Sequence, residues 1–276
     1  MTADGDGAPD ATARKPATSG RRDLLIILAA GAGSIAAFRG ASSLLDRATD
    51  DLGFISVDDP PGFRRLSLFG ATTGALDPFA GIDAPGQTAE TEDVLPEVPE
   101  AAFCRALFGR ARVEAGIVPI AFFSDYNCPN CELLLEDLIA LEAEARGRVH
   151  IQRHEWPILG EPSEISARAA IAAGRQGAQS AFNRRLQRTS FAPSEAYLRE
   201  VAQSADIDPD RLIADMASDS TTRELRTSAA LVRRFAFPGT PALVVGRTIV
   251  VGTIRTATLE ALVRAEESAG PPPGCR

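Results

Sequence analysis

The stretch FFSDYNCPNCELLLEDL, residues 122–138, joins an apolar run to a helical pattern and contains two of the chain's four cysteines. The apolar run itself, GIVPIAFFS (116–124), is continuous and bounded by Gly and Asp, which predicts a fully buried central strand. In CPNCELLLEDLIALEAEARG (128–147), apolar residues then recur at helical spacing up to a closing glycine, which predicts a helix. Cys128 and Cys131 therefore lie where a strand turns into a helix.

The segments on the C-terminal side extend this pattern. RVHIQRHEWPIL (148–159) begins with alternating apolar residues and predicts a second strand, and strand–helix–strand implies parallel pairing. The chain from Ser163 to about Arg234 has a helical pattern, with Ser163, Ser194 and Asp208 as expected helix starts.

Two strands and a helix follow the helical segment. ALVVG (242–246) and TIVVG (248–252) meet at Gly246-Arg247, which predicts a hairpin, and TATLEALVRAEES (256–268) predicts a helix with a Thr cap. The order is β-α-β, helices, then β-β-α. We therefore expect an α/β domain over residues 101–276, with a thioredoxin-like plan and a helical insertion over about 162–235.

Composition and charge narrow the class of protein. Of 276 residues, 45% are hydrophobic and 24% charged, which is ordinary for a globular protein of one or two domains. The net charge is −8, and no long basic block or interleaving of aromatic and basic residues occurs, so nucleic acid is not an expected partner. Four cysteines are too few for a disulfide scaffold, but they suffice for one catalytic pair and one further disulfide.

The N-terminal segments predict export. Residues 1–20 are polar and small, which is typical of a disordered tail. Residues 21–40 begin with paired arginines, and the mild apolar stretch 24–38 that follows resembles a bacterial twin-arginine signal. Both a cleaved signal peptide and an uncleaved anchor to the inner membrane fit this pattern. Either way we expect a periplasmic domain whose cysteines face an oxidising compartment.

The chain between the signal and the domain predicts a tether. Over residues 41–100, clusters of Asp, Pro and Gly interrupt every periodic pattern, and TAETEDVLPEVPE is acidic and unsuited to folding alone. We expect an irregular region, and whether the middle stretch FRRLSLFGATTGALDPFAGI packs on the main domain stays open.

The spacing of the two cysteines suits disulfide exchange. Pro129 fits the first helical position, so Cys128 is the predicted N-cap residue, close to unpaired backbone N–H groups and to the positive end of the helix dipole. Both favour the thiolate, the attacking species in disulfide exchange. Cys131 follows one turn later on the same face and is expected to be more buried. It can resolve a mixed disulfide formed by Cys128.

Two other interpretations of the pair are weaker. The cysteines could be inert buried thiols, but a proline between them at a strand-to-helix turn argues against this. With His150 and His154 they also resemble an elongated zinc-finger spacing. The histidines fall in a predicted strand, however, where four residues span roughly 13 Å, too far to share one tetrahedral ion. We expect no metal site.

Three stretches together resemble the DsbA-type thiol–disulfide oxidoreductases of the thioredoxin superfamily: FFSDYNCPNC, WPILGEPSEISARAAIAA and FPGTPALVVG. The resemblance covers about residues 117–268. It implies that Cys128 is the nucleophile and Cys131 the resolving thiol, without a cofactor. It also implies that Pro241 is a cis-proline facing the disulfide, and that Thr240 offers its backbone to an extended substrate peptide.

The chain also departs from that family. Pro129 and Asn130, the two residues between the cysteines, are expected to support the active site. The strongest oxidants of the family have Pro-His at these positions, so Asn130 replaces the histidine. The acidic residue that helps to deprotonate the resolving cysteine in many relatives has no obvious counterpart. Asp125 and Glu155 are weak candidates, and surface solvation is the expected role of each.

The remaining cysteines, Cys104 and Cys275, lie at the beginning of the expected domain and near the C-terminus. In an oxidising compartment they could form a structural disulfide, which we favour, although each could instead be free.

The expected function is an exported enzyme that exchanges disulfides with cysteine-containing protein substrates, more as an oxidant than as a reductant. It requires a membrane or soluble redox partner that recycles the pair. The alternatives are a non-catalytic thioredoxin-fold chaperone for metals or proteins, and a reductase or isomerase in the same compartment.

Overall fold

The computed structural model describes residues 52–67, 95–186 and 193–276, all within one unit that runs from Thr49 to Arg276. The predicted N-terminal tail (1–20) and export signal (21–40) lie outside the described residues. Within the described ranges, no helix is both long and apolar enough to span a membrane.

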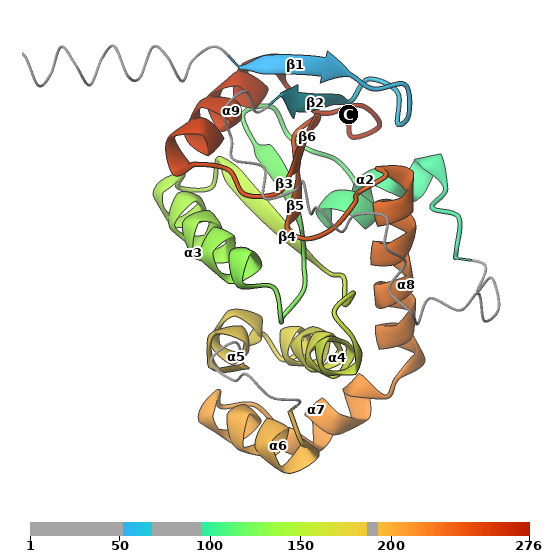
Figure 1. Ribbon diagram of the computed structural model, residues 1–276, viewed down its shortest axis with the longest axis vertical. Helices are drawn as coiled ribbons and strands as arrows, with labels where there is room; N and C mark the ends of the chain where they lie inside the picture. Colours follow the sequence, from blue (N-terminus) through green and yellow to red (C-terminus); the bar gives the residue numbers. More distant parts are fainter. Residues whose placement is uncertain (1–51, 68–94, 187–192) are drawn as a thin grey trace, which may run out of the picture. The chain divides into compact units, whose positions relative to one another are not determined.

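One mixed sheet of six strands organises the described chain (Figure 1). In sequence order the strands are β1 (Gly53–Ser56), β2 (Arg64–Ser67), β3 (Val118–Ser124), β4 (Val149–Glu155), β5 (Ala242–Val245) and β6 (Thr248–Val251). Their order across the sheet is β1-β2-β6-β5-β3-β4. β3 pairs with β4 in parallel and with β5 antiparallel, and β5 and β6 form the predicted antiparallel hairpin.

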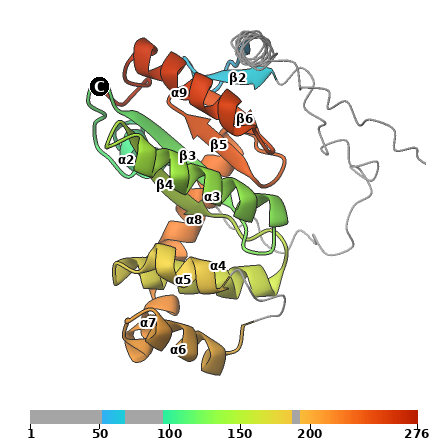
Figure 2. The same cartoon turned by 90° about the vertical axis from the view of Figure 1, so that its left-hand side faces the viewer.

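Eight helices connect and cover these strands in the described ranges. They are α2 (Glu100–Phe108), α3 (Pro129–Glu144), α4 (Glu161–Arg175), α5 (Gln179–Leu186), α6 (Glu195–Ser204), α7 (Pro209–Met216), α8 (Asp219–Arg234) and α9 (Thr256–Ala269). α3 connects β3 to β4, so the predicted parallel β-α-β unit is present. The helices α4 to α8 all lie between β4 and β5 in the chain (Figure 2).

Two of the predicted helix starts are capped as expected, and two helices begin at other residues or have another cap than predicted. Ser194 and Asp208 are N-cap residues whose side chains accept backbone N–H bonds, as predicted. α4, in contrast, begins at Glu161 after Gly160, two residues before the expected start at Ser163. The hydroxyl of Ser163 binds a buried carboxylate instead of capping the helix. α9 begins at Thr256, so its cap is Arg255 and not a threonine.

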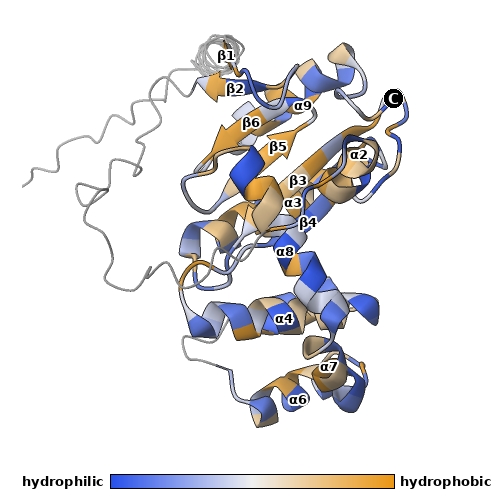
Figure 3. Cartoon of the chain, turned by 90° about the vertical axis from the view of Figure 1, so that its right-hand side faces the viewer, coloured by the Kyte–Doolittle hydropathy of each residue, from blue (hydrophilic) through white to orange (hydrophobic). Residues whose placement is uncertain are grey.

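Each face of the sheet has its own hydrophobic core because side chains alternate along β3. Ile120 and Phe122 join the cluster that contains leucines of α3 and α9, whereas Ala121 and Phe123 join the cluster that contains residues of α2 and α8. Figure 3 shows β3, β5 and β6 in hydrophobic colours, with hydrophilic residues on α8. β3 is buried along all but its last residue, as expected of a central strand.

The helices α4 to α7 have a separate core. Alanines of α4 pack there with Phe182 of α5, Leu198 of α6 and Leu212 of α7. α8 then returns to the sheet, where Leu231 and Val232 enter the cluster of α2. The helices α4 to α7 therefore pack around a hydrophobic core of their own, apart from the two cores on the faces of the sheet.

The expectation of an irregular tether over 41–100, with a domain beginning at 101, is wrong for residues 53–67. β1 and β2 pair antiparallel, and β2 extends the sheet by pairing in parallel with β6. The guanidinium of Arg64 lies 2.7 Å from the buried carboxylate of Glu266 in α9 and donates to Thr248 at 2.9 Å. Strands of four residues are too short to show a period, and the distant β6 and α9 hold them in place.

The expected disulfide between Cys104 and Cys275 is present. It connects α2 to the C-terminal residues across a sequence separation of 171, with Cα atoms 5.1 Å apart. The N–H of Val113 also donates to the carbonyl oxygen of Cys275 at 2.8 Å. The C-terminus is thus fixed against the core that contains α2.

Candidate active site

The strand-to-helix turn has the predicted geometry. Cys128 is the N-cap residue of α3, in an extended conformation with φ −93° and ψ 107°, and Pro129 occupies the first helical position. The backbone N–H of Cys131 donates to the carbonyl oxygen of Cys128 at 3.0 Å. The first turn of α3 therefore brings the two cysteines together.

The two thiols differ in burial in the predicted sense. Both cysteines are free thiols in the structure. Cys128 is 7% exposed, whereas Cys131 is 1% exposed. Pro129 and Asn130, between them, are exposed. Cys128 is therefore the more accessible of the two thiols, and Cys131 is almost fully buried.

The pKa values of the two thiols are shifted in opposite directions. A hydrogen bond from Cys131 is the main cause that lowers the pKa of Cys128 to about 6. Contacts with Thr240 and with the backbone N–H groups of Cys131 and Asn130 act in the same direction, and burial opposes them. The pKa of Cys131 is raised, first by its bond to Cys128 and then by burial. The pair thus favours a Cys128 thiolate held by a Cys131 thiol.

A distant loop lies against this pair. The Thr240–Pro241 peptide bond is cis, as the family resemblance implies, and Pro241 is buried directly before β5. The thiol of Cys128 lies 3.6 Å from the carbonyl oxygen of Thr240. The antiparallel pairing of β3 with β5 brings this loop to the end of β3, where the cysteine turn begins.

The structure corrects the expectation that Asp125 and Glu155 are solvated surface residues, because they are only 2% and 4% exposed. Ser124 and Glu155 are paired across β3 and β4, so both carboxylates lie at the same end of the sheet. The helical segment covers that end: Ser163 of α4 donates to Asp125, and Gln179 contacts Glu155. Their burial depends on helices distant in sequence.

The two carboxylates have different environments. Asp125 accepts four hydrogen bonds through its carboxylate oxygens. For Glu155, burial is the main cause that raises its pKa to about 8, with Arg153 opposing the shift. One oxygen of Glu155 lacks a hydrogen-bond partner among the described residues. Glu155 is therefore protonated over much of the neutral pH range. The carboxylate of Asp125, in contrast, has hydrogen-bond donors at both of its oxygens.

The histidines of the zinc interpretation have structural contacts. The ring of His154 stacks on Phe123 with centroids 4.5 Å apart, and its nitrogens contact the carbonyl oxygen of Leu107 at 2.8 Å and the hydroxyl of Ser228 at 3.3 Å. Burial lowers the pKa of His154 to about 4. The described ranges contain no group of three or more His, Cys, Asp or Glu side chains that could hold a metal ion.

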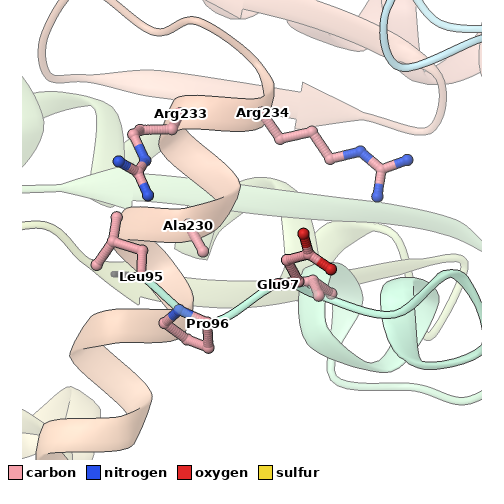
Figure 4. A pocket seen from close by; sticks show the side chains of 7 residues that line it. Leu95, Pro96, Glu97, Ala230, Arg233 and Arg234 are labelled. Carbon is pink, nitrogen blue, oxygen red and sulfur yellow. The ribbon is translucent and has the colours of Figure 1, made fainter. Parts of the chain in front are cut away.

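A pocket of about 340 Å³ lies elsewhere, between the segment before α2 and the last turns of α8 (Figure 4). The residues that line it are Leu95, Pro96, Glu97, Val98, Ala230, Arg233 and Arg234. None of them belongs to the cysteine turn or to the Thr240–Pro241 loop, so the pocket is not part of the candidate active site.

Comparison with known families identifies the domain. The model of a family described as "DSBA-like thioredoxin domain" matches residues 119–264, which include the cysteine turn, the helical segment and the cis-proline loop. The expected α/β, thioredoxin-like fold is thereby confirmed. No curated protein sequence matches the chain.

Solved structures give the same fold. A thioredoxin-like oxidoreductase from Silicibacter pomeroyi is 32% identical, with a TM-score of 0.53 over 59% of this chain and 97% of that chain. The thiol-disulfide exchange protein alpha-DsbA2 from Wolbachia pipientis is 22% identical, with a TM-score of 0.53 over 60% and 93%. A periplasmic thioredoxin-like protein from Salmonella enterica serovar Typhimurium is 24% identical, with a TM-score of 0.53 over 62% and 99%.

Proposed function

The chain belongs to the family of DSBA-like thioredoxin domains and is a thiol–disulfide oxidoreductase, and we propose that it exchanges disulfides with cysteine-containing protein substrates through Cys128 and Cys131. The observation that carries this proposal is the asymmetry of the pair. Cys128 is the more accessible thiol and has a pKa lowered to about 6, whereas Cys131 is buried and its pKa is raised.

The proposed reaction uses the two thiols in order. In the oxidised enzyme, a substrate thiolate attacks the sulfur of Cys128, the bond between the two enzyme sulfurs breaks, and Cys131 leaves and takes up a proton. A second substrate thiolate then attacks the substrate sulfur of the mixed disulfide and releases Cys128 as a thiolate. The substrate loses two electrons, which the enzyme pair gains, and a membrane or soluble redox partner must remove them.

The lowered pKa of Cys128 favours the oxidising direction. A stabilised thiolate lowers the free energy of the reduced enzyme, so the pair accepts electrons more readily. A pKa of about 6 lies between the values of about 3.5 for the strongest oxidant of the superfamily and about 7 for thioredoxin. We therefore propose a reduction potential between about −120 and −270 mV.

We further propose that the protein acts after export to the periplasm, either released or anchored by residues 24–38. The paired arginines before a mild apolar stretch support export. The disulfide between Cys104 and Cys275 also fits an oxidising compartment. One structure with the same fold is described as periplasmic.

The test is oxidation of a reduced peptide that contains two cysteines, followed with wild type, Cys128→Ser and Cys131→Ser. We expect turnover by the wild type with a redox buffer and none by either variant, because each lacks the Cys128–Cys131 disulfide that accepts the electrons. With a peptide that already contains a disulfide, Cys131→Ser should still form a mixed disulfide through Cys128, whereas Cys128→Ser should not. A wild type that binds the peptide but never oxidises, reduces or isomerises it would instead indicate the non-catalytic chaperone.

A further inference from the structure

One serine of the helical segment, α4 to α8, reaches the cysteine turn. Ser163 lies in the first turn of α4 and is completely buried. Its hydroxyl donates to the carboxylate of Asp125 at 2.6 Å and accepts from the side-chain amide of Asn127 at 2.8 Å. These partners lie 38 and 36 residues earlier in the chain, in the turn that leads into Cys128. Ser163 therefore joins the helical segment to the residues just before the reactive thiol.

Asp125 extends this contact to both cysteines. The carboxylate oxygen that accepts from Ser163 also accepts the backbone N–H of Asn127, at 2.7 Å. The carbonyl oxygen of Asp125 accepts the N–H of Cys128 at 3.2 Å, and its own N–H bonds to the sulfur of Cys131. The backbone before Cys128 is thus held by the same carboxylate oxygen to which Ser163 donates.

The position of that backbone decides how the two sulfurs face each other. Cys131 belongs to the first turn of α3, whereas Cys128 is the N-cap residue, with a φ of −93° and a ψ of 107° outside the helical region. The hydrogen bond from Cys131 is the main cause of the lowered pKa of Cys128. Because hydrogen bonds weaken steeply when their angle departs from linearity, a loosened turn weakens the bond that favours the thiolate.

We propose that Ser163 is a positioning residue for disulfide exchange. Through Asp125 and Asn127, its hydroxyl holds the cysteine turn in the geometry in which the Cys131 thiol donates to the sulfur of Cys128. This inference rests on the proposed function. No electron or proton of the exchange passes through Ser163, which sets only the relative position of the two sulfurs. The stretch WPILGEPSEISARAAIAA, to which Ser163 belongs, thereby acquires a role in the chemistry of the pair.

The test compares Ser163→Ala with Ser166→Ala. Ser166 is a second buried serine of α4, and its hydroxyl donates to the carbonyl oxygen of Pro162 in the same helix, at 2.9 Å. Both changes remove a buried hydroxyl from one helix, so a general loss of packing or stability should affect both variants. Of the two hydroxyls, only that of Ser163 bonds to the cysteine turn.

The pKa of Cys128 and the reduction potential of the pair are the readouts. Thiolate absorbance against pH measures the pKa, which in Ser163→Ala should rise from about 6 by about half a unit to one unit. The equilibrium constant for reduction of the pair by glutathione at pH 7 should then fall about threefold to fivefold. Ser166→Ala should leave both quantities unchanged.

Asn127→Ala tests the same connection from its other side. Asn127 is exposed, so this variant does not depend on whether Ser163→Ala folds. It removes one of the two bonds of the Ser163 hydroxyl to the turn and should raise the pKa of Cys128 by about 0.3 unit. The double variant should shift the pKa no further than Ser163→Ala alone, because both changes break one connection.

Three results would overturn the inference. The first is an unchanged pKa of Cys128 in Ser163→Ala, or in Asn127→Ala if Ser163→Ala does not fold. The second is an equal shift in Ser166→Ala, which would show that α4 as a whole is responsible. The third is a double variant whose shift is the sum of the single ones. A wild type that exchanges disulfides with no peptide would refute the proposed function, whereas the pKa comparison needs no substrate and still decides the role of Ser163.

Discussion

The sulfur of Cys128 lies 3.6 Å from the carbonyl oxygen of Thr240, although 112 residues separate them in the chain. This contact brings two short sequence motifs together in one site: Cys-Pro-Asn-Cys at 128–131 and Gly-Thr-Pro at 239–241. Because the thiol at the contact also has the lowered pKa, it is the position where we expect the chemistry to begin.

The hydrogen bond from Cys131 should control the acidity of Cys128. Replacement of Cys131 by Ala removes the main cause of the lowered pKa, so the pKa of Cys128 should rise from about 6 by about 1 to 2 units. Cys131→Ser retains a donor and should show a smaller rise. The ultraviolet absorbance of the thiolate against pH measures both, and an unchanged value in Cys131→Ala would show that the helix N-terminus dominates.

Asn130 should limit the oxidising power of the pair. Its side chain has no charge, whereas a histidine can place a positive charge beside the Cys128 thiolate and stabilise the reduced form. Asn130→His should therefore raise the reduction potential and lower the pKa of Cys128, and Asn130→Gln should change neither. Equilibration with glutathione buffers measures the potential. A wild-type pKa below about 4 would contradict the argument, because other charges would then dominate.

Glu155 should make the protein less stable as the pH rises. Its pKa is about 8 in the folded protein and about 4.3 when unfolded, so the folded state binds more protons between these values. The contribution of Glu155 to the free energy of unfolding is fully present below the unfolded pKa of about 4.3. It is lost as the pH rises through the folded pKa of about 8. Glu155→Gln should remove this contribution, with a slope difference of at most about 1.36 kcal/mol per pH unit.

Urea unfolding of wild type and Glu155→Gln between about pH 6.5 and 8, in the same redox state, measures this difference. His154, with a pKa of about 4 in the folded protein, contributes mainly below that window. Parallel stability curves for the two proteins would show that Glu155 is ionised in the folded state throughout.

The disulfide between Cys104 and Cys275 should stabilise the fold without affecting the reactive thiol. Replacement of both by Ser should lower the free energy of unfolding by about 2 to 5 kcal/mol, because the disulfide closes a loop across a sequence separation of 171. The pKa of Cys128 should stay at its wild-type value. A shifted pKa at unchanged secondary structure would show that this disulfide influences the active site.

Arg21 and Arg22 should determine export. Replacement of both by Lys keeps the charge but removes the paired arginines, so precursor should accumulate in the cytoplasm if the twin-arginine pathway is used. Cell fractionation of the two versions tests this. Unchanged delivery to the periplasm would indicate another export pathway or a simple signal-anchor.

The sequence alone determined the features that depend on neighbours in the chain. Pro129 at the first helical position and Cys128 at the cap are set by local geometry, and the continuous apolar run of β3 shows that it is a buried strand. The β5–β6 hairpin likewise follows from two short apolar runs joined by two residues.

Only the tertiary structure decided the environment of Asp125 and Glu155 and the place of residues 53–67. Both carboxylates are buried because α4 and α5 cover the ends of β3 and β4, and no period along the chain indicates which distant helix covers a polar side chain. β2 is ordered by pairing with β6 and by the contact of Arg64 with Glu266, and β1 is ordered by pairing with β2. Local propensity and capping act over a few residues, whereas burial and edge pairing depend on segments that meet only when the whole chain has folded.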